Sequence, residues 1–200
     1  MARMKVDQRR TGLIAAALRV MSGRGVSAAT TRAVVAEADM SLASFHYAFN
    51  SREEMMGEAI KTVINEEPGL VVDFVPASTD PAAVLEQALN AYLDRLIADP
   101  GRQAAMVELN EYAIRVPALK DLASLQYAAY RNSVQQTLST TSERFGWQWS
   151  VPLETMARLV LCIVDGVNLQ WLADRDTASA RATLQAAARG LTVHVSQTAS

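Results

Sequence analysis

Long apolar-periodic segments separated by proline and glycine are the feature that most constrains this chain. Most of the sequence is rich in Ala, Leu, Gln, Glu and Arg, and Pro and Gly fall mainly at segment ends. Apolar side chains recur at helical spacing, and no segment alternates convincingly as a strand would. The pattern predicts an all-α fold with helices near residues 6–22, 31–38, 42–48, 51–66, 81–98, 102–115, 117–145, 152–173 and 177–196.

Two of these segments are unusually short and lie close together. Thr30 and Ser41 are good N-caps, so each can begin a helix of about two turns. Asp39 and Met40 form a tight corner between them, and Phe49 ends the second helix with an apolar anchor. A bent pair whose second helix is short and exposed is what a helix-turn-helix requires, although such pairs also occur as plain structure.

The next helix marks the predicted domain boundary. Ser51 and Glu54 form a capping-box pattern at its start, and Pro68 and Gly69 oppose its continuation. We expect a helix-turn-helix domain over 1–50 and a larger helical domain over 51–200, connected by the helix at about 51–66. The stretch from Leu70 to Pro81 is predicted to be irregular.

Charge is distributed unevenly along the chain. The whole sequence carries a formal net charge of −2 and has a pI near 5.7, which is unusual for a protein that binds nucleic acid. Up to Ala36, however, there are seven basic residues and one acid, Asp7, so this segment has an excess of six positive charges. A basic segment beside an exposed helix favours DNA binding.

Several function classes lack the residues they need. The single cysteine, Cys162, excludes a disulfide framework and a thiol metal site, and His46 and His194 lie far apart. No phosphate-binding glycine loop or nucleophile with a base is present, so we expect no enzyme activity, no metal and no cofactor. The most apolar run, Leu159 to Val164, is short and is followed by Asp165, which indicates a buried helix of a cytoplasmic protein with no membrane segment.

The run TTRAVVAEADMSLASFHYAFNSREEMM, residues 30–56, resembles the signature of the TetR family of transcriptional regulators. The resemblance covers the family's usual opening, the small residues between the two helices, the Ser cap, both Phe anchors and the start of the next helix. Three positions depart from the usual pattern: Asp39 and Ala43 replace glycines, and His46 replaces a tyrosine. Asp tolerates the left-handed conformation that such a turn needs better than most residues do.

The candidate DNA contacts follow from helix geometry and the family pattern. The positions of the second short helix that its Phe anchors do not use should face the groove, with Ser44 and Ala43 reading bases. His46 is the open case, because its imidazole can contact phosphate or be packed or simply solvated. Thr31, Tyr47 and Arg52 are expected to contact phosphates. The basic residues nearer the terminus are also expected at the DNA backbone, although such charges are often only solvated. The full set is Lys5, Arg9, Arg10, Thr30, Thr31, Arg32, Ser41, Leu42, Ala43, Ser44, His46, Tyr47 and Arg52.

The remainder of the chain resembles TetR-family regulatory domains in layout, most clearly over 108–119 and 165–172. The resemblance implies a cavity among the middle helices. Aromatic walls with a few polar groups are typical of such cavities, although these residues can also be ordinary core. The candidates are Met106, Asn110, Tyr127, Tyr130, Phe145, Trp147, Asp165, Asn168 and Trp171. Asp165 and Asn168 need partners if buried, and Arg115 could pair with Asp165.

The resemblance also implies that the last two helices pair with a second subunit. The final helix carries one stripe of small and apolar residues, which permits close helix contact but could equally face the chain's own core. The stripe is Ala180, Leu184, Ala187, Ala188, Leu191 and Val195.

These observations predict a homodimeric, ligand-responsive repressor. It would bind a palindromic double-stranded DNA operator and be released by a small, mostly apolar inducer. The alternatives are a regulator that activates and a helical protein-interaction module. An interaction module would leave the basic first segment unexplained.

Overall fold

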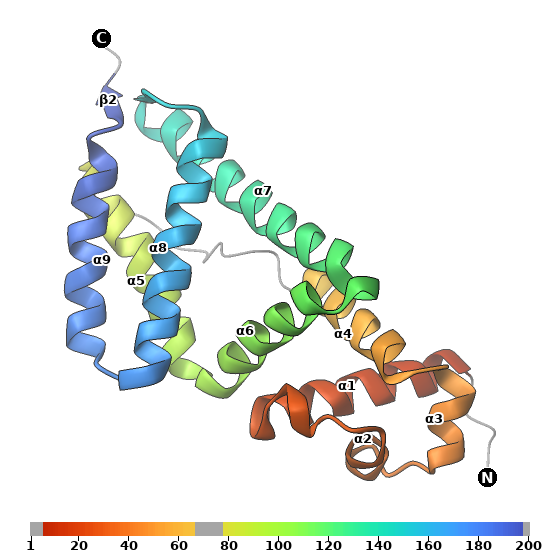
Figure 1. The fold of residues 1–200 in the computed structure, drawn as a ribbon. Helices are drawn as coiled ribbons and strands as arrows, with labels where there is room; N and C mark the ends of the chain where they lie inside the picture. The colour runs from red at the N-terminus through yellow and green to blue at the C-terminus, as the bar shows by residue number, and fades with distance from the viewer. Residues whose placement is uncertain (1–5, 67–77, 198–200) are drawn as a thin grey trace. The chain divides into compact units, whose positions relative to one another are not determined.

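The computed structural model describes residues 6–66 and 78–197 (Figure 1). The chain forms two compact units. The first comprises Met1–Glu67 and Pro100–Gln126, and the second comprises Pro68–Asp99 and Tyr127–Ser200. Each unit has its own hydrophobic core. We keep 1–50 as the proposed DNA-binding segment, and note that it shares one core with residues 55–63 and 105–123.

The first unit begins with a helix-turn-helix held on a long first helix. Helix α1 (Val6–Arg24) is followed by a short 3-10 turn, η1 (Val26–Ala28), and by α2 (Thr31–Glu37) and α3 (Leu42–Ala48). In this unit α1 contacts α2, α3 and α4 (Arg52–Glu66). The three helices α2, α3 and α4 are therefore fixed by burying apolar side chains against α1.

The predicted caps of the two short helices are confirmed. The N–H of Ala33 donates to Thr30 Oγ1 at 3.2 Å, and the N–H of Ser44 donates to Ser41 Oγ at 3.2 Å. Each cap satisfies a donor that the first helical turn leaves without a partner. Asp39 has φ of 52°, so the turn uses the left-handed conformation expected at this position.

The cap of α4 differs in part from the capping box. Ser51 Oγ accepts the N–H of Glu54 at 3.0 Å, as predicted. The carboxylate of Glu54, however, accepts the backbone N–H of Asn50 at 2.9 Å and its side-chain amide at 2.8 Å, in place of the Ser51 N–H. The reciprocal bond is thus made one residue earlier, and it ties the end of α3 to the start of α4.

The first unit is completed by residues that follow much later in the chain. These are α6 (Pro100–Arg115), the 3-10 turn η2 (Pro117–Leu119) and the first residues of α7 (Lys120–Phe145). A Cβ at Gly57 of α4 would lie 3.2 Å from Leu119 Cδ2, so the absence of a side chain permits this approach. The predicted helix over 117–145 is thus divided in the structure into the 3-10 turn η2 and the α-helix α7.

The second unit contains α5 (Pro81–Ala98), the remaining residues of α7, α8 (Leu153–Asp174) and α9 (Thr177–Thr192). Helices α8 and α9 run side by side with α5 behind them (Figure 1). Its core includes Leu93, Met156 and Leu184, whose side chains are fully buried. The predicted irregular stretch from Leu70 lies outside the described residues as far as residue 77, and α5 begins at Pro81.

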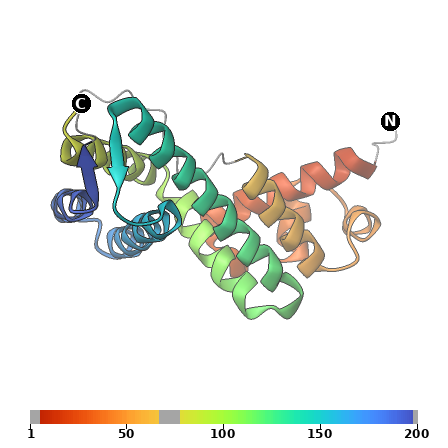
Figure 2. The same ribbon diagram turned by 90° about the horizontal axis from the view of Figure 1, so that it is seen from above.

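Two short strands in the second unit were not predicted. Strand β1 (Trp147–Trp149) pairs antiparallel with β2 (Val195–Gln197), as the two adjacent arrows in Figure 2 show. The predicted last helix, which extended to residue 196, is wrong in its final residues because α9 ends at Thr192. Val193 and Val195 are β-branched and disfavour a helix, and the aromatic β1 offers a pairing partner.

Of the helices that the structure describes, α8 alone is long and apolar enough to cross a membrane by length and composition. It is a core helix of the second unit, since Met156, Val164 and Trp171 on one face are buried. The interpretation of the apolar run as a core helix is consistent with this burial.

Candidate DNA-contact surface and ligand cavity

Helix α3 has a buried face and an exposed face. Phe45 and Ala48 are buried, and the ring of Phe45 lies 5.5 Å from that of Phe49. The opposite face is exposed and consists of Leu42, Ala43, His46 and Tyr47, with Ser44 half-buried. The positions predicted to face DNA are thus those that the core leaves accessible. Their contacts with bases and phosphates stay a prediction.

The predicted contacts at and before the two short helices are also accessible. Thr30, Arg32 and Ser41 are exposed, and Thr31 is half-buried. Thr30 and Ser41 use one side-chain oxygen each for capping, but each oxygen has a second acceptor site and a hydroxyl proton. Capping and a polar contact to a phosphate are therefore compatible.

The basic residues near the terminus have different surroundings. Lys5 lies outside the described residues. The guanidinium of Arg9 lies 5.3 Å from the ring centre of Tyr47, which places a cation beside the exposed face of α3. We retain Arg9 as a predicted backbone contact.

Arg10 has a structural use that the sequence did not indicate. Its Nη1 donates to the Ala48 carbonyl at 2.6 Å and to Glu54 Oε1 at 3.1 Å, and its guanidinium lies 4.4 Å from the centre of the Phe49 ring. The pKa of Glu54 is lowered, first by the backbone N–H of Asn50 and then by Arg10. Arg10 therefore joins α1 to the end of α3, and the prediction that it serves as a phosphate contact is not favoured.

Arg52 likewise directs its donors into the protein. Nε donates to the Ala29 carbonyl at 2.8 Å, Nη2 to the Val26 carbonyl at 2.8 Å, and Nη1 to the Tyr112 hydroxyl at 3.1 Å. The guanidinium also lies 5.2 Å from the centre of the Tyr112 ring. The predicted phosphate contact is not favoured by this geometry, because the guanidinium donates to carbonyls of the segment that leads into α2 and to Tyr112.

Glu108 of α6 binds the same segment and was missed. Its Oε2 accepts the backbone N–H of Val26 at 2.6 Å, and the carboxylate lies where a side chain at Gly25 would be. Gly25 has φ of 82°, so glycine is needed here for conformation and for space. Glu108 and Tyr112 are one turn apart on α6, and together with Arg52 they form what we call the η1 clamp.

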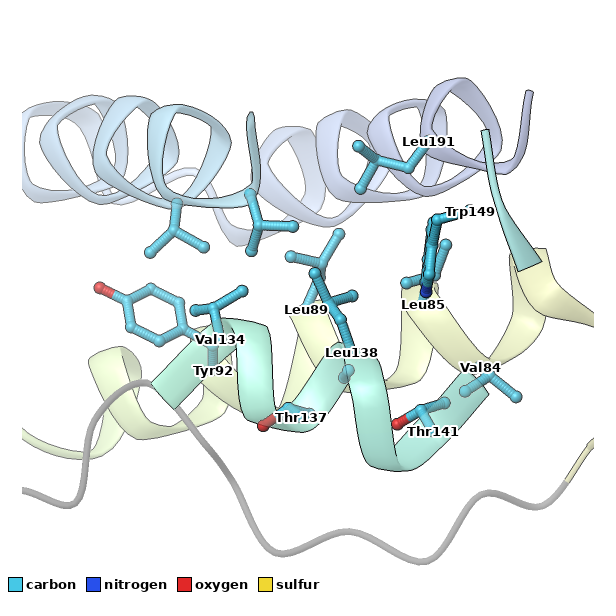
Figure 3. Close-up of a pocket in the computed structure, with 13 residues that line it drawn as sticks. Val84, Leu85, Leu89, Tyr92, Val134, Thr137, Leu138, Thr141, Trp149 and Leu191 are labelled. Atoms are coloured by element: carbon cyan, nitrogen blue, oxygen red, sulfur yellow. The ribbon is translucent and has the colours of Figure 1, made fainter. Parts of the chain in front are cut away.

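The second unit contains an apolar cavity of about 80 Å³ (Figure 3). Its walls come from α5, α7, α8 and α9 and from β1. In Figure 3, Tyr92 lies at the opposite end of the cavity from Trp149 and Leu191. Hydroxyl groups of Thr137 and Thr141 and the two aromatic side chains are the polar contributions. The lining is Val84, Leu85, Ala88, Leu89, Tyr92, Val134, Thr137, Leu138, Thr141, Trp149, Val160, Val164 and Leu191.

None of the nine predicted pocket residues is in this lining. Met106 and Asn110 are in the first unit, where Met106 belongs to the core. Phe145 and Trp147 stack on each other with ring centres 5.0 Å apart. Trp171 lines a separate, smaller pocket of about 30 Å³ beside α9, and its indole N–H donates to Thr177 Oγ1.

The remaining four predicted pocket residues lie together on α7 and α8. Tyr127 donates its hydroxyl to Asp165 Oδ2 at 3.0 Å, and the rings of Tyr127 and Tyr130 meet edge to face with centres 6.0 Å apart. Burial raises the pKa of Asp165, while the Tyr127 hydrogen bond lowers it to a smaller extent. Burial and the neighbouring carboxylate also raise the pKa of Tyr127. Asn168 is buried, and Tyr127 takes the place suggested for Arg115.

The stripe predicted to pair with a second subunit is largely buried within the chain. Ala180, Leu184, Ala188 and Leu191 belong to the second core, where α9 packs on α5. Ala187 is half-buried, and Val195 lies in β2. For the four buried residues the predicted pairing is not favoured, and their burial agrees with the alternative of an intrachain core face. Apolar spacing alone does not distinguish the two.

Two family models match this chain. One, described as bacterial regulatory proteins of the tetR family, matches residues 13–59, which contain the helix-turn-helix. The other, described as the C-terminal part of BetI-type transcriptional repressors, matches residues 81–195, more than half of the sequence. The chain belongs to the TetR family.

Individual relatives of this TetR-family chain agree with the assignment. It is 28% identical over 172 residues to the HTH-type nicotine-responsive transcriptional repressor HdnoR of Paenarthrobacter nicotinovorans, covering 86% of this chain and 88% of that protein. It is 31% identical to the multidrug binding protein EbrR, solved in complex with ethidium, with a TM-score of 0.65 over 90% of this chain and 98% of the other. A TetR-family regulator from Mesorhizobium loti shares the fold, with a TM-score of 0.75, 14% identity and coverage of 96% and 99%.

Proposed function

We propose that this TetR-family regulator represses transcription by binding a palindromic operator as a homodimer through α3, and that a small molecule in the cavity of the second unit releases it. The observation that carries the proposal is an apolar cavity in a unit separate from the one that bears the exposed face of α3. A regulator needs two such sites if binding at one is to alter binding at the other. Such a protein acts in the cytoplasm, where the DNA is.

The cavity favours a mostly apolar ligand with an aromatic group. Leu and Val side chains form most of its walls, and the rings of Tyr92 and Trp149 stand at its two ends. Flat aromatic ligands bury well against such walls. The relatives named for nicotine response and solved with ethidium support this class of ligand for the present chain.

The η1 clamp supplies a route from ligand to DNA. Helix α5 contributes Tyr92 to the cavity and ends at Ala98, and α6 begins two residues later at Pro100. On α6, Glu108 accepts the N–H of Val26 in the segment that leads into α2, and the Tyr112 hydroxyl accepts from Arg52, which itself donates to the Val26 and Ala29 carbonyls of that segment. A ligand that displaces α5 would move α6, and the clamp would carry that displacement to α2 and α3. To act in this way, the ligand must bind the released conformation more tightly than the operator-bound one.

The dimer contact is proposed on the exposed faces of α8 and α9. On α8, Leu159 is 39% exposed and Leu169 is 52% exposed, and both lie on a side of the helix that the second core leaves free. On α9, Ala182 and Ala186 are exposed on the side away from the buried stripe, and Val193 beyond its end is 74% exposed. Exposed apolar side chains at helical spacing beside small residues suit close packing of helices from two subunits.

The experiment is operator selection followed by release. Random double-stranded oligonucleotides retained by the full chain should converge on a palindrome whose half-sites lie one or more helical turns apart. An effective ligand should weaken operator binding by about 5- to 150-fold, and operator should weaken ligand binding by the same factor. Failure to retain any DNA at moderate salt would favour an interaction module instead. Transcription from the selected site, with and without the protein, separates repression from activation.

A further inference from the structure

Beyond the apolar cavity, the second unit contains a polar group of side chains that the cavity itself does not explain. We propose that Tyr127, Tyr130, Asp165 and Asn168 bind the protonated amine of a ligand whose apolar body occupies the cavity. This inference rests on the proposed function and specifies its ligand as an organic cation that carries N–H donors.

The helices that line the cavity also carry these side chains. On α7, Val134 and Leu138 line the cavity, and Tyr130 and Tyr127 precede Val134 by four and seven residues, so they continue the same helix face. On α8, Val160 and Val164 line the cavity, and Asn168 continues their four-residue spacing. Four residues advance a helix by about 6 Å. The polar group therefore begins about one turn beyond the apolar lining, within reach of a substituent on a bound ring.

Asp165 lacks a cationic partner among the described residues. Its carboxylate is half-buried, and the contact that the structure gives it is the hydroxyl of Tyr127, at 3.0 Å. An ionised carboxylate can accept about four hydrogen bonds, and burying it with one neutral donor is unfavourable. A ligand cation that reached Asp165 would supply both the opposite charge and further donors. The edge-to-face rings of Tyr127 and Tyr130 can add cation–π attraction.

Asn168 gives a second, independent indication. The residue is only 6% exposed, and its Oδ1 is buried without a hydrogen-bond donor in the described part of the chain. A buried acceptor of this kind requires a donor. Asp165 and Asn168 thus offer acceptors, and the nearby Tyr127 hydroxyl is already directed at Asp165. A protonated amine matches this set better than an anion or a further acceptor does. The described residues hold no group of three or more His, Cys, Asp and Glu that suits a metal ion.

The test compares molecules of one shape and different charge. Phenethylamine, phenethyl alcohol and propylbenzene differ at one terminal group, and their dissociation constants for the full chain can be measured by calorimetry at neutral pH. We expect the amine to bind about 10- to 100-fold more tightly than propylbenzene, the range for a hydrogen bond to a charged group. The trimethylammonium derivative, which has no N–H, should bind more weakly than the amine because Asn168 then lacks a donor. Equal or tighter binding of propylbenzene, or no measurable binding of the amine, would overturn the proposal.

Substitution separates the charge from the shape of the site. Asp165→Asn should remove the preference for the amine and change the affinity for propylbenzene by less than about twofold. Glu154→Gln, which removes an exposed acid of the same helix, is the matched control and should keep the preference. Persistence of the preference in a folded D165N protein would refute the role of Asp165. If D165N does not fold, the comparison of the three ligands on the unaltered chain still tests whether the site prefers an amine.

The same ligands distinguish this inference from the proposed function. If the neutral ligand binds and releases operator as well as the amine does, the amine site is refuted and the repressor mechanism stands. If the amine binds through Asp165 but leaves operator affinity unchanged, the site stands and release by cavity ligands is refuted.

Discussion

Replacing Arg52 tests whether its side chain binds DNA or holds the helix-turn-helix together. The structure gives its guanidinium three hydrogen bonds, to the carbonyls of Val26 and Ala29 and to the Tyr112 hydroxyl. Hydrogen bonds of a charged donor contribute about 1.5 to 3 kcal/mol each when buried. Arg52 is half-buried, so water can replace part of each bond. We expect Arg52→Ala to lower the free energy of unfolding by about 2 to 4 kcal/mol.

Two measurements decide the question. Denaturant unfolding at fixed protein concentration gives the stability change from the shift of the midpoint. The salt dependence of operator affinity gives the number of phosphate contacts, because each one lost reduces the slope of log affinity against log salt by about 0.9. For Arg52→Ala under conditions where the protein stays folded, the slope should be unchanged. Arg52→Lys keeps the positive charge but lacks the planar guanidinium with its several N–H donors. This variant should also be less stable than the unaltered protein.

Arg32 provides the matched control, because it is exposed on α2 and is a predicted DNA contact. Arg32→Ala should change stability by less than about 0.5 kcal/mol. It should reduce the salt slope by about 0.9 if it contacts a phosphate. The structural role of Arg52 is refuted by two results together. Arg52→Ala would have to be as stable as the unaltered protein, and its slope of log operator affinity against log salt would have to fall as it does for Arg32→Ala.

Three further predictions concern the second unit. Leu184→Asp places a charge in the core and should lower the free energy of unfolding by at least about 3 kcal/mol, measured by thermal or chemical unfolding. Ala182→Asp places a charge in the proposed dimer contact, so the chain should stay folded but sediment as a monomer. Asp165→Asn should raise the melting temperature at pH 7, because the raised pKa of Asp165 means that ionisation of this carboxyl opposes folding. The gain in melting temperature should disappear as the pH falls toward 3.8, the ordinary pKa of an aspartate. Ala88→Phe should fill the cavity and abolish ligand release while operator binding in gel-shift assays persists.

The local parts of the fold were predictable because their signals are local. The caps at Thr30 and Ser41, the turn at Asp39 and the proline that opens α5 each act on neighbouring backbone groups, and the structure has them where the sequence places them. The exposed face of α3 followed from its two Phe anchors. These features need no knowledge of which helix packs on which.

The tertiary roles were not predictable from one sequence. The stripe containing Leu184 suits a partner subunit and α5 of the same chain equally well, and only packing decides. Arg10 and Arg52 were interpreted as phosphate contacts from charge, but their acceptors are carbonyls and side chains 23 to 60 residues away in the sequence. Trp149 was missed because a strand of three residues carries too little pattern to be detected.

The pairing of β1 with β2 makes Val195–Gln197 part of the support of the cavity wall. Trp149 forms a wall of the cavity, and its register partner is Val195. Proteolytic trimming, a fused tag or a reporter domain attached there would disturb the strand that backs this tryptophan. Ligand affinities measured on such variants would then differ from those of the native chain even though every helix remained folded. Biosensors built from this protein should therefore carry their fusions elsewhere.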